Sequence, residues 1–339
     1  MRAFVITVLA LAGAALLPAA KNLEIYFIDV EGGQATLFVA PSGESMLIDT
    51  GWSGHNARDA SRIAAAAKHA GVKKIDYLLI THFHEDHVGG VPQLAAKLPI
   101  LNFIDHGESV EHDPHANELY KAYLEYRAKG NHILAKPGDT IPIKGLEVKV
   151  LTADGDEIAS PLEGAGRANP LCPGDRLHAP DPSENARSIG TLITFGNFKA
   201  LDLGDLTWNK EHQLVCPANK IGTVDLYIVT HHGSDLSSSP ALVHAVTPRV
   251  AIMDNGARKG GSPATWKTIH TSPGLEDIWQ LHYSIAGGKD NNAPDTFIAN
   301  TDEVGDTGDW IRVTVHPDGS YIVYNERNKY SKTYSPKGN

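Results

Sequence analysis

The sequence predicts a single α/β domain, and three of its features carry that prediction. Segments rich in β-branched and aromatic residues recur between Gly, Pro and Ser turns, beginning with 23–30, 35–40 and 45–50. A helical pattern follows over 56–71, and 74–81 is almost continuously apolar, as expected for a strand buried on both faces. The 339 residues suffice for one large core, and no repeat, charge block or linker divides the chain.

The remaining elements alternate in the same way. Asn56 is expected to cap helix 56–71 at its start. The later elements are expected to be strand 100–105, helix 115–130, hairpins 139–155 and 188–206, strand 224–234, helix 239–248, strand 249–256, and a helix that begins at 262. Between these hairpins, residues 156–184 are rich in Gly, Pro, Asp and Ser, which predicts a long surface loop of the kind that often borders an active site. A core over 23–270 would then be followed by a C-terminal helix and hairpin over 271–326.

The first twenty residues differ in character from the rest. A positively charged start, an apolar stretch over 4–17 and small residues after it indicate a secretory signal peptide over 1–20. The apolar stretch is shorter than the roughly 20 residues that a membrane span needs. Pro18 makes the cleavage signal imperfect, so an uncleaved N-terminal anchor is the alternative. We therefore expect a periplasmic or secreted domain over 21–339, with no stable membrane span after cleavage.

Charge and cysteine content narrow the environment and the partners. The formal net charge of -10 disfavours tight, non-specific binding of nucleic acid over the whole surface, although a local cationic pocket is compatible with it. Cys172 and Cys216 permit one disulfide in an oxidising compartment, and two buried free thiols are the alternative.

The stretch THFHEDHVGG (81–90) is the strongest chemical signal in the chain. It places His82, His84, Asp86 and His87 within six residues, directly after the predicted buried strand. Alternate residues share a face at a strand end, so His82 and His84 can bind one cation. A turn after them can place Asp86 and His87 beside a second cation. Imidazole and carboxylate ligands suit zinc, and also manganese or iron. The sequence therefore predicts a centre of two divalent metal ions.

This His-x-His-x-Asp-His pattern resembles the hallmark of the metallo-β-lactamase fold hydrolases. The segments MLIDTG (46–51), LDLGDL (201–206) and VTHHGS (229–234) are similar to further motifs of that family, in the same order. The resemblance covers 23 to about 270 and implies a four-layer αββα sandwich. FIDVEGGQATLF, NARSIGTLITF and HHGSDLSSS further resemble the hydrolase domain of bacterial competence DNA-uptake proteins and the phosphorylcholine esterases.

The resemblance also implies which side chains form the centre. Asp205 would bridge both metals, and Asp86 would hold one metal and orient the nucleophile. The ligand set would be His82, His84, Asp86, His87, Asp205 and His231. Adjacent strand residues point to opposite faces, so only one of His231 and His232 is expected to bind metal; we favour His231 as ligand and His232 as the catalytic acid.

Four further residues are expected around the metals. Asp49 is expected to support a ligand histidine by a hydrogen bond. Asn185 stands where the wider family places a third histidine on the first metal, and it would instead donate to a substrate oxygen. Arg258 and Lys259 could supply positive charge for the substrate.

The expected function is that of a secreted, dinuclear metal-dependent hydrolase that cleaves phosphodiester bonds through a metal-bound hydroxide. The substrate would be a small or cell-wall-associated phosphodiester, with nucleic acid less favoured. Alternatives are β-lactam, lactone or other ester hydrolysis on the same fold, an extracellular nuclease, and, least favoured, a metal-binding module without activity. The chain has no Gly-x-Ser-x-Gly turn, so serine nucleophile chemistry has no support.

Overall fold

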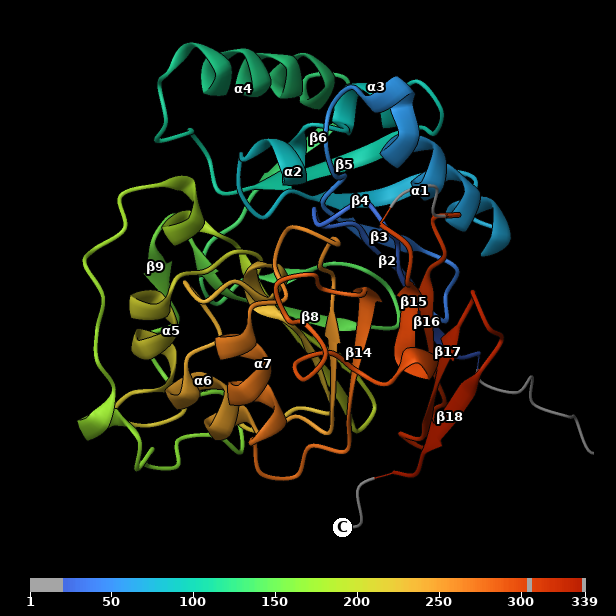
Figure 1. Cartoon of the computed structure of the whole chain (residues 1–339). Coiled ribbons are helices and arrows are strands. Elements are labelled where there is room, and N and C mark those ends of the chain that lie inside the picture. The colour runs from blue at the N-terminus through green and yellow to red at the C-terminus, as the bar shows by residue number, and fades with distance from the viewer. Residues whose placement is uncertain (1–20, 304–306, 337–339) are drawn as a thin grey trace, which may run out of the picture.

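The computed structural model describes residues 21–303 and 307–336, and the predicted signal peptide over 1–20 lies outside them. The described residues form two mixed sheets that face each other, with helices on both outer faces (Figure 1). The predicted four-layer αββα sandwich is thus confirmed. Within these residues, every helix is too short or too polar to cross a membrane.

The first sheet has the strand order β18-β17-β16-β1-β2-β3-β4-β5-β6. Strands β1 to β3 are antiparallel, as predicted, whereas β3 to β6 run parallel. The strands span β1 Leu23–Phe27, β2 Thr36–Val39, β3 Ser45–Ile48, β4 Ile75–Leu79, β5 Ile100–Asp105, β6 Asn131–Leu134, β16 Ile311–Val315, β17 Tyr321–Asn325 and β18 Ser331–Tyr334.

The second sheet has the order β15-β14-β13-β12-β11-β10-β8-β7, and β9 pairs with β8. Its two predicted hairpins, β7–β8 and β10–β11, are antiparallel, and β11 to β15 run parallel. The strands span β7 Thr140–Ile141, β8 Glu147–Ala153, β9 Asp156–Glu157, β10 Gly190–Phe195, β11 Phe198–Asp202, β12 Leu226–Ile228, β13 Val250–Met253, β14 Asp277–His282 and β15 Ile298–Asn300.

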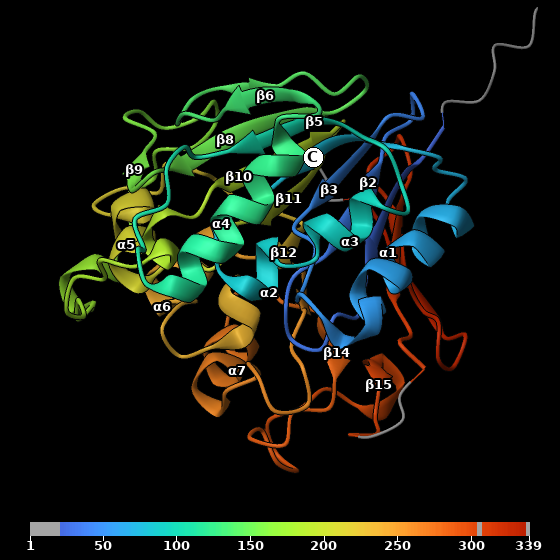
Figure 2. The ribbon, with the colours of Figure 1, turned by 90° about the horizontal axis from the view of Figure 1, so that it is seen from above.

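Helices cover the outer face of each sheet. Helices α1 to α4 lie over the first sheet, and α5 to α7 lie over the second (Figures 1 and 2). Their bounds are α1 Arg58–His69, α2 Glu85–Val88, α3 Val91–Ala95, α4 Pro114–Arg127, α5 Trp208–Val215, α6 Pro240–Val246 and α7 Pro263–His270.

Three apolar clusters hold the four layers together. Phe27 and Phe198 belong to the cluster between the two sheets. Tyr123 of α4 packs on the outside of the first sheet, and Leu242 of α6 packs on the outside of the second. Each of these side chains is almost fully buried, which stabilises the fold by about 1.5–3 kcal/mol per large apolar side chain.

The C-terminal part differs from the prediction. No helix other than a short 3-10 turn, Asp295–Phe297, forms among the described residues of 271–326. Strand β14 instead extends the second sheet beside β13, and β16 pairs with β1 of the first sheet. The reason is that a short apolar run such as 277–282 fits a buried strand as well as a helix, and its sheet partner decides.

Two local predictions are also corrected. Asn56 does not cap α1, because the helix begins at Arg58 and both Asn56 and Ala57 have left-handed backbone angles. The strand predicted over 224–234 ends at Ile228, and a 3-10 turn, Thr230–Gly233, follows it.

Candidate metal centre

The centre is built by segments that follow the ends of three strands. His82 follows β4, and His84 precedes the first residue of α2, so Asp86 and His87 lie in the first turn of that helix. Asp205 follows β11, and the 3-10 turn with two histidines follows β12. Strand β4 belongs to the first sheet and strands β11 and β12 to the second, so the packing of the two sheets against each other brings these distant segments together.

Gly204 allows the close approach of two of these segments. Its φ of 55° lies in the left-handed region, and a Cβ there would lie 2.8 Å from Cβ of Thr81. A side chain at this position would therefore push Asp205 away from the His82 segment.

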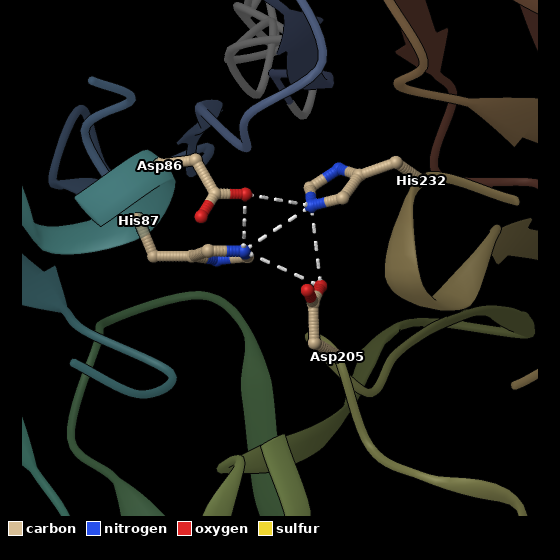
Figure 3. Close-up of side chains that lie close together, drawn as sticks. All are labelled: Asp86, His87, Asp205 and His232. Carbon is tan, nitrogen blue, oxygen red and sulfur yellow. Dashed lines mark hydrogen bonds and ion pairs between the residues drawn. The ribbon is translucent and has the colours of Figure 1, made fainter. Parts of the chain in front are cut away.

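Four buried side chains converge most tightly, namely Asp86, His87, Asp205 and His232 (Figure 3). We call them the cation cluster. Nε2 of His87 lies 3.3 Å from Asp86 Oδ2 and 3.3 Å from Asp205 Oδ1. Nε2 of His232 lies 3.2 Å from Asp86 Oδ2 and 3.3 Å from Asp205 Oδ1, and the two Nε2 atoms are 3.2 Å apart.

His82 and His84 extend this cluster. Nε2 of His82 lies 3.0 Å from Nδ1 of His84, and the rings of His82 and His87 have centroids 4.1 Å apart. Burial, and next the nearby His87, lower the pKa of His82 well below its ordinary value. A neutral His82 imidazole retains a lone pair, which is the form that binds metals.

The cation cluster fits a divalent metal ion. Ligand atoms placed tetrahedrally about 2.0–2.1 Å from zinc lie about 3.3–3.4 Å from one another. The measured separations of 3.2–3.3 Å match that spacing. In addition, the buried Oδ1 atom of Asp205 has no hydrogen-bond partner. The charge and the spacing of these donors are therefore those of a metal site.

The pKa shifts in the cluster show that its carboxylates favour a positive charge beside them. Burial disfavours the ionised form of Asp205, yet the facing histidines hold its pKa well below the usual range. Burial and Lys259 oppose the charged form of His232, but Asp205 and Asp254 raise its pKa to about 10. Ionised carboxylates thus attract either protons on the histidines or a metal ion.

Polar partners behind the rings orient four of the histidines. Nδ1 of His87 lies 2.7 Å from Asp49 Oδ2, as expected if it donates there and turns the lone pair of Nε2 toward the cluster. Glu111 lies 3.0 Å from Nε2 of His84. Nδ1 of His231 lies 3.1 Å from Ser237 Oγ, and Nδ1 of His232 lies 3.6 Å from Asp254 Oδ2. Sequence reasoning missed Glu111, Ser237 and Asp254, because no local pattern marks them.

The comparison with known families agrees with this geometry. Residues 29–166 match the model of the metallo-beta-lactamase superfamily. The chain carries a metallo-beta-lactamase domain. The family resemblance predicted from the motifs is therefore confirmed.

Three curated relatives of this metallo-beta-lactamase domain have low sequence identity. Hydroxyacylglutathione hydrolase of Stenotrophomonas maltophilia is 32% identical over 106 residues, which is 31% of this chain. ComE operon protein 3 of Bacillus subtilis is 24% identical over 69% of the chain, and Recombination protein 2 of Haemophilus influenzae is 25% identical over 72%. The matches span only 37%, 28% and 25% of the length of these relatives.

Solved structures with some similarity include two metal-containing or metal-dependent enzymes. Tm1679, a metal-dependent hydrolase of the beta-lactamase superfamily, has 15% identity and a TM-score of 0.44, with coverage of 76% of this chain and 95% of that chain. CmlA, a diiron beta-hydroxylase from Streptomyces venezuelae, has 15% identity and a TM-score of 0.40, with coverage of 77% and 48%.

The pair His231 and His232 does not follow the strand geometry assumed from the sequence. Both residues lie in the 3-10 turn with left-handed backbone angles, φ 57° for His231 and 55° for His232. Both rings therefore face Asp205 instead of pointing to opposite sides. His232 lies inside the cation cluster, whereas Nε2 of His231 lies 3.3 Å from the other oxygen of Asp205, Oδ2.

The predicted cationic residues separate in the structure. Nζ of Lys259 contacts Asp86 Oδ2, donates to the Gly32 carbonyl at 2.8 Å and lies 5.2 Å from the ring centre of Trp52. Arg258 is 73% exposed in its side chain and pairs with Glu303, so it does not join Lys259 beside the cluster.

Asn185 lies in a 3-10 turn, Glu184–Arg187, outside the cation cluster. Its neighbour Glu184 is buried and accepts a hydrogen bond at 3.0 Å from the backbone N–H of Phe83, which lies between His82 and His84. Glu184 also contacts Nε2 of His106 at 2.9 Å. The turn that carries Asn185 is thus fixed to the metal-ligand segment.

Proposed function

We propose that this chain is an exported, dinuclear metal-dependent phosphodiesterase. The observation that carries the proposal is the position of Asp205 between two groups of histidines. Its Oδ1 atom faces His87 and His232, while its Oδ2 atom faces His231. A carboxylate whose two oxygens face different histidines is suited to bridge two cations, and Nε2 of His82 and Nδ1 of His84, which lie 3.0 Å apart, are further donors for one of them.

The donors divide naturally into two sets that share Asp205. We assign one divalent ion to His82, His84 and Asp205, and the other to Asp86, His87, His232 and Asp205. Zinc is the proposed metal, with manganese or iron as alternatives that the same donors accept. Bound there, the ions would supply an activated water and neutralise charge on the phosphate.

The side chains around the metals have separate tasks in this proposal. Asp49 holds the proton on Nδ1 of His87 and so keeps Nε2 available as a ligand. Lys259, which is 37% exposed in its side chain, brings an ammonium group beside Asp86 that can pair with a phosphate oxygen. This positive charge favours an anionic substrate over a neutral lactone.

His231 is the proposed proton donor, and His232 the proposed ligand, which reverses the preference drawn from the sequence. The side chain of His231 is 13% exposed, whereas that of His232 is 1% exposed and lies among the donors. If Ser237 donates to Nδ1 of His231, the proton of that ring resides on Nε2. From there it can pass to the alcohol oxygen that leaves the phosphorus.

The proposed location outside the cytoplasm rests on the leader sequence and on one covalent bond. Cys172 and Cys216 form a disulfide. Disulfides persist in oxidising compartments such as the periplasm, and they are rare in the cytosol.

The test is a substrate screen on protein loaded with zinc or manganese. We expect hydrolysis of bis(p-nitrophenyl) phosphate, with about two equivalents of metal found by elemental analysis. Inertness toward phosphodiesters combined with turnover of nitrocefin or of an acyl-homoserine lactone would reverse the order of the candidates. A plasmid nicking assay with manganese in the same screen separates a nuclease from an enzyme for small diesters.

A second candidate is an acyl hydrolase. It is favoured by the match to hydroxyacylglutathione hydrolase, which is the relative of highest identity named above. The match spans 106 residues, which is 31% of this chain and 37% of that relative. Release of glutathione from a hydroxyacylglutathione, without release of p-nitrophenol from the diester, would favour this candidate.

A further inference from the structure

A groove of about 350 Å³ lies beside the candidate metal centre. Its walls are residues 178–183 of the long loop, Asn185 and Leu236, and its floor is Thr207–Asn209 at the start of α5. We propose that this groove binds an uncharged, aromatic or hydrocarbon-rich ester group of the substrate. The proposal rests on the proposed function, because it gives the class of phosphodiester that the centre would accept.

The lining is attached to the residues of the centre on both sides. Thr207 follows Asp205 by two positions, and Leu236 precedes Ser237, the partner of His231. The backbone N–H of Trp208 donates to the Leu236 carbonyl at 3.1 Å, which joins the floor to that wall. A substrate phosphate near Asp205 and His231 would therefore have this groove as its neighbour.

The charge of the lining selects against a polyanion. None of the described residues that line the groove is Lys or Arg, and the one carboxylate among them is that of Asp181. A nucleic-acid strand would need cations along its path outside the cation cluster. The ammonium group of Lys259, in contrast, contacts Asp86 within the centre. The phosphate charge is thus neutralised at the metals, and the attached group enters a cation-free groove.

The apolar surface of the groove suits a ring or a hydrocarbon chain. The ring of Trp208 stacks on His178 with centroids 4.7 Å apart and planes 19° apart, and its Nε1–H donates to Asp175 at 2.9 Å. Both contacts hold the indole in place before a substrate binds. Leu236 is 52% exposed, and burial of such a side chain against a ligand is favourable.

Asn185 supplies the polar contact between the groove and the centre. Its side-chain amide makes no hydrogen bond to the described residues, although its Oδ1 atom is buried. The turn that carries it leads to Ser188, whose Oγ accepts from the backbone N–H of Asp205 at 3.2 Å. The amide nitrogen can donate to an ester oxygen of the bound group, whereas the buried Oδ1 atom is an acceptor without a partner among the described residues.

The test is calorimetric binding of phenylphosphonate and methylphosphonate to the metal-loaded full chain. Both ligands present the same phosphonate to the metals, and they differ in the group that would enter the groove. We expect phenylphosphonate to bind about tenfold more tightly, and Leu236→Ser to reduce this ratio to about twofold. Leu177→Ser is the matched control, because Leu177 is 57% exposed on the same loop but does not line the groove.

The outcomes distinguish the groove from the proposed function. Equal binding of the two phosphonates, or an equal loss of the ratio in both variants, would overturn the groove proposal even if the enzyme cleaves phosphodiesters. A roughly tenfold preference for phenylphosphonate over methylphosphonate in a protein that cleaves no phosphodiester would support the groove and refute the proposed function. Tighter binding of an oligothymidylate than of phenylphosphonate, weakened by Leu236→Ser, would show that the groove accepts a polynucleotide and overturn the proposal.

Discussion

Asp205 is the residue on which both proposed cation sites depend. Replacement by Asn keeps the size of the side chain but removes the charge that faces three histidines. We expect Asp205→Asn to bind fewer than two metal equivalents and to lose about 100-fold or more in activity. Elemental analysis together with the diester assay measures both effects.

Asp202→Asn is the matched control for that substitution. Asp202 is a buried carboxylate three positions away, and burial raises its pKa to about 7, so it already carries a proton part of the time near neutral pH. It accepts from Gly204 and Gln34 and does not belong to the cation cluster. Equal loss of metal in the two variants would show that the effect is not specific to Asp205.

Glu111 provides a test of how the histidines are oriented. Its carboxylate lies 3.0 Å from Nε2 of His84, so it fixes the ring whose Nδ1 faces His82. We expect Glu111→Ala to weaken metal binding by about 10–100-fold and Glu111→Gln to recover part of that loss. Competition with a chromogenic chelator gives the affinities. Glu108→Ala, an exposed site on the same loop, should match the wild type.

At the level of elements, a buried carboxylate joins α5 to the segment that follows the histidine turn. Glu211 accepts from the backbone N–H of Ser238 and Ser239, both at 2.7 Å. Burial outweighs these hydrogen bonds and raises its pKa to about 7. The folded protein therefore retains a proton that the unfolded chain releases near pH 4.5.

The sign of the pH dependence follows from this difference. Between about pH 4.5 and 7 the folded state binds more protons than the unfolded state at Glu211, so this group lowers the free energy of unfolding as pH rises, by about 3 kcal/mol in total. Glu211→Gln should remove that slope, whatever its constant effect on stability. Urea unfolding at pH 5 and pH 7.5 gives the comparison, and an unchanged slope in the variant would contradict the assignment.

At the level of the whole molecule, the proposed metal ligands come from both halves of the sandwich. His82 to His87 follow β4 of the first sheet, and Asp205 and His232 follow β11 and β12 of the second. Metal ions held between them would link the two halves in the folded state only. We expect chelation by EDTA to lower Tm by about 5–10 °C. Calorimetry measures this shift, and Asp205→Asn should show a much smaller one.

The motifs in the sequence were sufficient to predict the layers of this fold and to name most of the side chains that the structure brings together at the candidate centre. The sequence reveals His82, His84, Asp86 and His87, because all four lie within six positions directly after a buried strand. Glu111 gave no such signal, since it lies 27 positions from His84 in a loop without periodicity. The directions of the His231 and His232 rings were also hidden, because two consecutive left-handed non-glycine residues are not marked by any sequence pattern. Strand β14 could not be distinguished from a helix by its sequence, because its pairing with β13 decides which of the two forms.

The disulfide between Cys172 and Cys216 ties the long loop to the end of α5, and Asp175 of that loop contacts both Trp208 and His212. Of the proposed metal ligands, only Asp205 lies between the two cysteines, and it follows strand β11 of the second sheet, outside the long loop. In a chain that has not yet been oxidised, the proposed metal ligands could therefore still come together, while the part of the long loop that lines the neighbouring groove would lack its covalent link to α5. For an exported enzyme, discrimination among esters would then be acquired in the destination compartment, after the capacity for hydrolysis itself.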